Sequence, residues 1–236
     1  MMRPIRVALS GSGFKFPAHV GALLAIRDFG FAPIEYAGTS GGSIVAALAA
    51  CGMDLNAMKA LTLRRDWSDM LTFSLFTALR GKGYCSGNAL LDWLTGQTFG
   101  AAFNELKTPL TIMSSDASTE TGFEFSKKAT GTTPVALAAR CSACIPVVYK
   151  AMPFQGAMLQ DGGLVNNIPV DKLIIDDVPR IGIQLTSKTA PLSKGRSLSV
   201  VELLARDVNM LLAANENTHV DLDLNEGAHV AFIETG

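Results

Sequence analysis

Two short apolar segments, each followed by a glycine-rich turn and a helix-forming stretch, constrain the fold of this chain more than any other feature. Residues 6–9 run directly into the glycine-rich turn at 10–13, and residues 18–29 then place apolar side chains at helical spacing. Residues 34–51 repeat the pattern, with the sequence GTSGG between an apolar strand and a helix of small residues. This βαβα order predicts a parallel sheet with right-handed crossovers and helices on both faces.

Strand-like and helix-like segments continue to alternate further along the chain. We expect strands at 110–114, 122–125, 156–160 and 180–185, and helices over much of 54–107, at 134–143 and at 199–216. No internal repeat, low-complexity tract or linker interrupts the 236 residues. The prediction is therefore a single α/β domain, residues 1–236, built as a three-layer α/β/α sandwich with a mainly parallel central sheet.

Charge and composition exclude several classes of function. The chain has 20 Lys and Arg against 21 Asp and Glu, a formal net charge of -1, and no basic run, so we expect no nucleic-acid partner. Its 48% of hydrophobic residues can form a full core without metals or staples. The four cysteines are too few and too irregularly spaced for a disulfide framework, and they fit a reducing compartment.

The hydrophobic segments of the sequence are all short. The amino-terminal residues lack the apolar core of a secretion signal. The longest apolar run, residues 44–51, is far shorter than the roughly 18 to 20 residues that a membrane-spanning helix needs. We therefore expect a cytoplasmic protein whose contact with a membrane, if it makes one, is peripheral.

The sequence Gly38-Thr39-Ser40-Gly41-Gly42 carries the strongest chemical signal. It is a Gly-x-Ser-x-Gly motif between a predicted strand and a predicted helix, which is the setting of a nucleophile elbow. In so tight a turn, Gly38 and Gly42 leave space that side chains would block. Ser40 would then lie at a helix amino terminus, where free N–H groups favour a developing negative charge. An ordinary glycine-rich turn is the alternative interpretation.

A second glycine-rich turn, Gly11-Ser12-Gly13, falls at the same edge of the predicted sheet. It lacks the third glycine of the dinucleotide fingerprint and the Gly-Lys-Ser/Thr of a P-loop, so neither nucleotide motif fits. Its backbone N–H groups, with that of Gly41, would complete an oxyanion hole. Taken alone, the segment has a loop without a ligand as its alternative interpretation.

A nucleophilic serine needs a base, and the sequence offers three histidines. His19 falls in the first predicted helix, where packing or capping is the expected role. His219 and His229 lie in the polar carboxyl-terminal stretch, where solvent exposure is expected.

A carboxylate is the other option for the base. Asp161 ends a predicted strand and is followed by Gly162 and Gly163, which let the backbone approach closely. An Asp-Gly pair alone usually marks only a turn. The pairing with Ser40 makes Asp161 the preferred candidate.

These motifs, in this order, resemble those of the patatin-like phospholipases, a family of lipid acyl hydrolases with a Ser-Asp dyad. The resemblance covers residues 5 to about 175 and rests on GSGFK at 11–15, the elbow around Ser40, SACIP at 142–146, and DGG at 161–163 followed by NNIP at 166–169. The chain has Ser12 where the family usually has glycine, and Phe16-Pro17 where a glycine is common. Residues 177–236 carry no motif.

The resemblance implies a patatin-like fold in which Ser40 is the nucleophile and Asp161 its base. It also implies which residues supply the oxyanion hole, namely the backbone N–H groups of Gly11, Ser12, Gly13 and Gly41, and which support the turns, namely Gly38, Gly42 and Gly162. The implied substrates are lipid or fatty-acyl esters, cleaved through an acyl-enzyme without a metal or organic cofactor. Ser142 and the three histidines lie outside this predicted machinery.

Two other functions stay open at this point. One is an α/β-hydrolase esterase with Ser40, an acid, and His219 or His229 as its triad, although Ser40 on the second strand is early for that fold. The other is a catalytically silent lipid-binding scaffold, in which the departures at Ser12 and Phe16 close the oxyanion hole.

Two further sequence features have plainer interpretations. Cys141 and Cys144 form a Cys-x-x-Cys pair, but no second pair or nearby histidine completes a zinc set, so we expect packing of small side chains. Residues 66–80 are unusually apolar. Core or a subunit interface is the favoured interpretation of this segment, and an interfacial lid that meets lipid is the alternative.

Overall fold

The structure is a computed structural model that describes residues 1–64, 67, 85–186, 203, 206, 210, 224 and 227–235. The elements of the first half are β1 (Arg3–Leu9), η1 (Gly13–Lys15), α1 (Pro17–Asp28), β2 (Phe31–Thr39), α2 (Ser40–Ala50), α3 (Leu55–Arg64), α5 (Asn88–Gln97) and η3 (Phe103–Glu105). Those of the second half are β3 (Leu110–Asp116), β4 (Thr121–Ser126), α6 (Lys127–Thr130), α7 (Val135–Ser142), β5 (Met152–Phe154), β6 (Ala157–Asp161), η4 (Gly162–Leu164), η5 (Val170–Lys172), β7 (Arg180–Thr186) and β8 (His229–Glu234).

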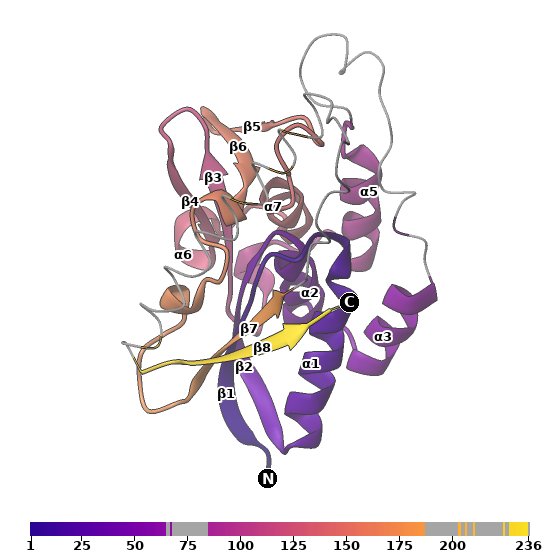
Figure 1. Ribbon diagram of the computed structural model, residues 1–236, viewed down its shortest axis with the longest axis vertical. Coiled ribbons are helices and arrows are strands. Elements are labelled where there is room, and N and C mark those ends of the chain that lie inside the picture. The colour runs from indigo at the N-terminus through magenta and orange to yellow at the C-terminus, as the bar shows by residue number, and fades with distance from the viewer. Residues whose placement is uncertain are drawn as a thin grey trace, which may run out of the picture.

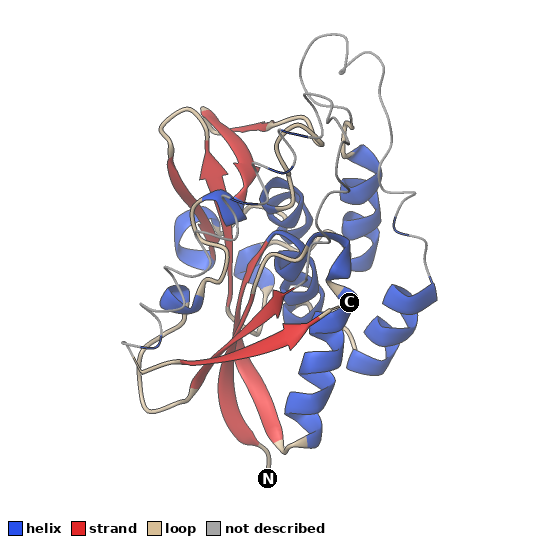
Figure 2. Cartoon of the chain, viewed as in Figure 1, coloured by secondary structure: helices blue, strands red, loops and turns tan. Residues whose placement is uncertain are grey.

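The strands form one mixed, mostly parallel sheet flanked by helices. Its order is β5-β6-β3-β2-β1-β7-β8, and β4 pairs with β3 outside this path. Strands β3, β2, β1, β7 and β8 are mutually parallel, whereas β4 and β6 run antiparallel to β3. Figure 2 shows the antiparallel group at one end of the parallel strands. The predicted α/β fold with a mainly parallel sheet is confirmed.

Helix α2 is the centre of the helical layer on one face of the sheet. Every residue of α2 except Ala49 is buried, and the helix packs against both α1 and α7 (Figure 1). It lies over a row of the sheet formed by Leu9, Gly38 and Ile112. A Cβ at Gly38 would lie 2.9 Å from the Cβ of Ala46 on α2, so the glycine lets helix and sheet approach closely.

The opposite face of the sheet carries a row of small residues. Ala8 pairs with Ala37 on one side and with Gly182 on the other. Ile168 and Val170 pack onto this row, and a Cβ at Gly182 would lie 2.6 Å from the Val170 side chain. The segment that carries these two residues can therefore lie flat on the sheet, directly after η4.

A buried ion-pair network lies next to this row. Arg6 and Glu35 are neighbours on β1 and β2, and an Arg6 guanidinium nitrogen lies 2.6 Å from Glu35 Oε2. Arg6 also pairs with Asp176, and Glu35 accepts the N–H of Ile174 at 3.1 Å. The network thus ties the chain that leads into β7 to the start of the sheet.

The structure extends most predicted elements by a few residues and adds two strands. Short β5 and carboxyl-terminal β8 were not predicted; β8 is an edge strand whose residues are only half covered. The predicted helix at 199–216 and the apolar segment at 66–80 lie outside the described residues apart from Leu203, Arg206, Met210 and the buried Trp67. Within the described part of the chain, no helix is both long and apolar enough to cross a bilayer.

Substituting Glu35→Ala tests the buried network. The change leaves the Arg6 charge buried with only the half-exposed Asp176 as partner, and such a loss typically costs about 3–5 kcal/mol of the free energy of unfolding. Urea denaturation measures this cost. The matched control is Asp28→Asn, which removes the exposed pair with Arg27 and should change stability by less than about 1 kcal/mol. Equal effects of the two substitutions would contradict the role given to Arg6 and Glu35.

Candidate active site

Ser40 lies at a sharp turn between β2 and α2, as the sequence predicts. It is the first residue of α2 and has a φ of +49°, a conformation that is strained for a residue with a Cβ. Gly42 faces the carbonyl oxygens of Leu9 and Ser10, which a Cβ would hit. A Cβ at Gly38 would lie 2.8 Å from the Cα of Ser43. The two glycines therefore allow the turn that presents Ser40.

Asp161 contacts Ser40, although the two residues are 121 positions apart in the sequence. The Ser40 Oγ–H donates to Asp161 Oδ2 at 2.6 Å, and Asp161 Oδ1 accepts the N–H of Gly163 at 2.9 Å. Asp161 ends β6 and pairs with Ser114 of β3, so its backbone is fixed by the sheet. The next residue is Gly162, and a Cβ at this position would collide with the Met113 carbonyl oxygen.

Burial makes the Asp161 carboxyl a weaker acid than an ordinary aspartate. Loss of solvent raises its pKa from the ordinary 3.8 to about 6, while the hydrogen bonds from Ser40 and Gly163 oppose this rise. A carboxylate with this pKa is a better proton acceptor at neutral pH than an exposed aspartate, and it remains ionised there.

The glycine-rich loop at 11–13 lies directly over the start of α2. A Cβ at Gly41 would lie 2.6 Å from the Gly13 carbonyl oxygen, and a Cβ at Gly11 would lie 3.4 Å from the Ser40 Cβ. Gly41 and Gly13 occupy the first turns of α2 and η1, where N–H groups have no helical partner. The loop and the elbow therefore bring backbone donors to one place.

One predicted donor of the oxyanion hole needs correction. The N–H of Gly11 already donates to the carbonyl oxygen of Asn167 at 2.9 Å, so it anchors the loop and is not directed at a ligand. The N–H groups of Ser12, Gly13 and Gly41 remain candidates. The departure at Phe16-Pro17 is accommodated, since Phe16 is buried in the core and Pro17 begins α1, a favourable position for proline.

Ser142 contacts the elbow, whereas the sequence motifs predict that it lies outside the catalytic machinery. Its Oγ accepts the N–H of Ser40 at 2.8 Å and donates to the Met113 carbonyl oxygen at 2.5 Å. Two residues further on, the carbonyl oxygen of Cys144 accepts the N–H of Asp161 at 2.9 Å. The signal was present in the sequence as the SACIP segment, but a serine at a helix end does not reveal which backbone group it binds.

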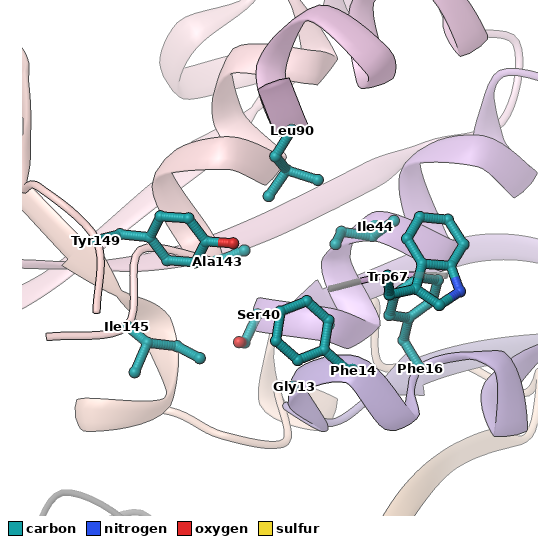
Figure 3. A pocket seen from close by; sticks show the side chains of 11 residues that line it. Gly13, Phe14, Phe16, Ser40, Ile44, Trp67, Leu90, Ala143, Ile145 and Tyr149 are labelled. Atoms are coloured by element: carbon teal, nitrogen blue, oxygen red, sulfur yellow. The ribbon is translucent and has the colours of Figure 1, made fainter. Parts of the chain in front are cut away.

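An apolar pocket lies beside Ser40. Figure 3 shows Phe14, Phe16 and Trp67 on one side of Ser40, and Ala143, Ile145 and Tyr149 on the other. Gly13, Gly41, Ile44 and Leu90 complete the lining. Trp67 packs edge-on against Phe16 and Trp93, with ring centroids 4.6 and 5.0 Å apart. The side chains that surround Ser40 suit an apolar ligand.

Arg140 fixes one wall of this pocket and was not singled out from the sequence. Its fully buried guanidinium donates to the carbonyl oxygens of Gly87 at 3.0 Å and Ser86 at 2.9 Å, just before α5. It also lies 4.8 Å from the ring centroid of Tyr149. Arg140 therefore joins α7, the start of α5 and the Tyr149 side of the pocket.

The histidines that the structure describes lie away from the Ser40 hydroxyl. His19 is buried, its Nε2 contacts the Ser10 carbonyl oxygen at 2.8 Å, and burial lowers its pKa to about 4. His229 is exposed at the start of β8, where it pairs with Ile181, at the end of the parallel strands opposite to Ser40. His219 lies outside the described residues.

Cys141 and Cys144 are buried, free thiols, as the packing interpretation expects. Burial raises the pKa of the Cys141 thiol to about 12, which opposes thiolate chemistry. Among the residues that the structure describes, no three His, Cys, Asp or Glu side chains are grouped as metal ligands.

Gly42→Ala tests the steric basis of the elbow. The new methyl group would collide with the carbonyl oxygens of Leu9 and Ser10, so we expect the free energy of unfolding to fall by about 2 kcal/mol or more. The matched control is Gly21→Ala on the exposed side of α1, where nothing lies within 4 Å and a gain of about 0.5–1 kcal/mol is expected. Thermal or urea denaturation compares the two, and a neutral Gly42→Ala would refute the close approach.

Comparisons with known proteins identify a family and a fold that this chain shares. Residues 7–174, which include Ser40 and Asp161, match the family model described as patatin-like phospholipase. An uncharacterized NTE family protein of Mycobacterium tuberculosis is 27% identical over 169 residues, which cover 70% of this chain and 44% of that protein. An uncharacterized protein of Acanthamoeba polyphaga mimivirus is 28% identical over 190 residues, covering 75% of this chain and 64% of that protein. The chain thus spans less than half the length of the mycobacterial relative.

Solved structures show the same fold. VipD from Legionella pneumophila superposes with a TM-score of 0.59 at 16% identity, covering 82% of this chain and 51% of that chain. ExoU of Pseudomonas aeruginosa, in complex with SpcU, gives a TM-score of 0.52 at 18% identity, covering 91% of this chain and 52% of that chain. From the family match over most of its length, we conclude that the chain belongs to the patatin-like phospholipase family.

Proposed function

We propose that this protein is a serine acyl hydrolase that cleaves fatty-acyl esters of lipids, as a phospholipase A or lysophospholipase-type esterase. The observation that carries the proposal is the 2.6 Å hydrogen bond from the Ser40 hydroxyl to the buried Asp161 carboxylate, at a strained elbow beside an apolar pocket. Family membership supports the class of reaction and the lipid nature of the substrate.

Acylation begins when the Ser40 Oγ attacks the ester carbonyl carbon. Asp161 takes the hydroxyl proton along the existing hydrogen bond, and the carbonyl oxygen becomes an oxyanion. The N–H groups of Ser12, Gly13 and Gly41 stabilise this charge, helped by the amino terminus of α2. When the tetrahedral intermediate collapses, the proton passes from Asp161 to the leaving alkoxide, and the acyl group stays on Ser40.

Deacylation repeats the same steps with water as the nucleophile. Asp161 accepts a proton from the water, the carbonyl carbon is attacked again, and the acid leaves while the proton returns to Ser40. The carboxyl pKa of about 6 suits this double role, because the group is ionised at neutral pH yet holds a transferred proton better than an exposed aspartate.

The pocket beside Ser40 supports a fatty-acyl substrate. Its lining is almost entirely apolar, and each methylene group that it removes from water contributes about 0.8 kcal/mol to binding. Phe14 is partly exposed at the glycine-rich loop, so the mouth of the pocket is apolar as well. The apolar lining beside Ser40 therefore supports a substrate in which an acyl chain adjoins the ester carbonyl.

Ser40→Ala should abolish hydrolysis of fatty-acyl esters and leave the fold intact, because the substitution removes only the attacking oxygen. Ester hydrolysis and circular dichroism measure the two effects. Ser118→Ala, in the exposed turn after β3, is the control that should keep full activity. Wild-type protein that binds lipid vesicles but hydrolyses no ester would favour the silent scaffold. Loss of activity in His219→Asn or His229→Asn would favour the α/β-hydrolase triad.

Asp161→Asn tests the base and its acidity together. Wild-type kcat/KM should rise with pH and reach half its plateau near pH 6, and the variant should lose roughly 100-fold or more in rate. The folded pKa lies above the unfolded value, so protonation favours the folded state. Wild-type stability should therefore fall by about 3 kcal/mol as pH rises from about 3 to about 7, and the variant should lack this slope. A pH-independent rate would contradict the assignment of Asp161.

A further inference from the structure

We propose that Ser142 is a positioning residue for the nucleophile: its hydroxyl holds the backbone of Ser40 in the left-handed conformation that directs Oγ at Asp161. The inference rests on the proposed function of the Ser40–Asp161 pair. It assigns to the end of α7 a role that the Ser-Asp dyad alone does not include.

The Ser142 hydroxyl makes two short hydrogen bonds in a fully buried position. It accepts the N–H of Ser40 at 2.8 Å and donates to the Met113 carbonyl oxygen at 2.5 Å. These contacts use its one donor and one of its acceptor positions. The hydroxyl therefore has a single orientation, set by the carbonyl of β3.

Ser40 needs such a partner because of its place in the chain. As the first residue of α2, its N–H has no acceptor within the helix, and a buried N–H without a partner is costly. The φ of +49° adds backbone strain. The Ser142 acceptor offsets both costs only while the elbow keeps this conformation.

The same segment also holds the base. The carbonyl oxygen of Cys144 accepts the N–H of Asp161 at 2.9 Å, and the Met113 carbonyl that Ser142 contacts lies against the Cα of Gly162. Residues 142–144 therefore connect the backbones of Ser40 and Asp161, which are far apart in sequence. A hydrogen bond of 2.6 Å between two side chains requires this mutual placement to be kept within a fraction of an ångström.

The arrangement has a consequence for the oxyanion hole. Since the N–H of Ser40 donates to Ser142, it is already occupied and is not free to bind an oxyanion. The next N–H, that of Gly41, is then the one that the elbow directs at the oxyanion. Loss of the Ser142 acceptor would free the Ser40 N–H and let the elbow turn, so both the nucleophile and its neighbouring donor would be misplaced.

The test compares Ser142→Ala, Ser142→Thr and Ser126→Ala by steady-state kinetics on a soluble short-chain ester, fluorophosphonate labelling rate and thermal denaturation. Ser126 is a matched control, because it is buried and its Oγ accepts a backbone N–H, that of Ala129, at the cap of α6 away from the site. Both alanine variants should lose stability. Only Ser142→Ala should lose kcat and labelling rate, by roughly 100-fold with KM within about twofold.

The pH profile separates positioning from a purely structural role. The hydrogen bond from Ser40 lowers the Asp161 pKa, so a loosened Ser40 should move the midpoint of the acid limb upward from about 6 in Ser142→Ala. Ser126→Ala should keep the wild-type midpoint. Ser142→Thr, which keeps the hydroxyl, should restore kcat and the midpoint toward wild type.

A folded Ser142→Ala with wild-type kcat, labelling rate and pH midpoint would overturn the proposal. So would a loss of activity that only follows the loss of folded protein, as in Ser126→Ala. If Ser142→Ala does not fold, Ser142→Cys, which keeps nearly the same shape but accepts weakly, replaces it. A folded Ser142→Cys with full kcat would then overturn the proposal. Full activity in Ser40→Ala would instead refute the proposed function itself.

Discussion

The close approach of α2 to β1 is the constraint on which the rest of the site depends. Gly42 places the first turn of the helix against the carbonyl oxygens of Leu9 and Ser10, where no side chain fits. This contact allows the strained conformation of Ser40, and the loop at 11–13 lies over Gly41. A glycine in the second half of the sequence, Gly162, does the same for the base by allowing the Met113 carbonyl to contact its Cα. Backbone packing therefore determines the chemistry.

Burial then sets the reactivity of the pair. An exposed aspartate with its ordinary pKa near 4 accepts a proton poorly, and its partner serine would be solvated. Here the carboxyl is fully buried, its pKa rises to about 6, and its two oxygens are occupied by Ser40 and the N–H of Gly163. This environment supports the role of base that we propose for Asp161. The desolvation that makes Asp161 a better base also makes it a source of instability above pH 6.

The local motifs could be predicted from sequence because glycine spacing and apolar periodicity report on backbone turns directly. The strand and helix around Ser40, and the turn after Asp161, follow from such patterns. The hydrogen bond between these two residues could not be derived from spacing alone, because they meet only through the pairing of β3 with β2 and β6. The resemblance to a family supplied that pairing in advance.

Other features needed three-dimensional information. Whether the Gly11 N–H faces a ligand or Asn167 depends on a segment more than 150 residues away, so its donor role could not be judged from the loop. Ser142 and Arg140 bind backbone carbonyls and N–H groups, which carry no sequence signature. Strand β8 has four apolar residues in a row, but so short a run does not by itself distinguish a strand from another apolar segment, and it was missed.

The most direct test of the account is to locate the covalent adduct that a fluorophosphonate forms with the wild-type protein. Peptide mass spectrometry after reaction at pH 8 would identify the modified residue and the number of adducts per chain. We expect one adduct, on Ser40, with a labelling rate that falls as the pH drops through about 6, the pKa of the Asp161 carboxyl. An adduct on another serine, or a folded protein that forms none, would contradict it.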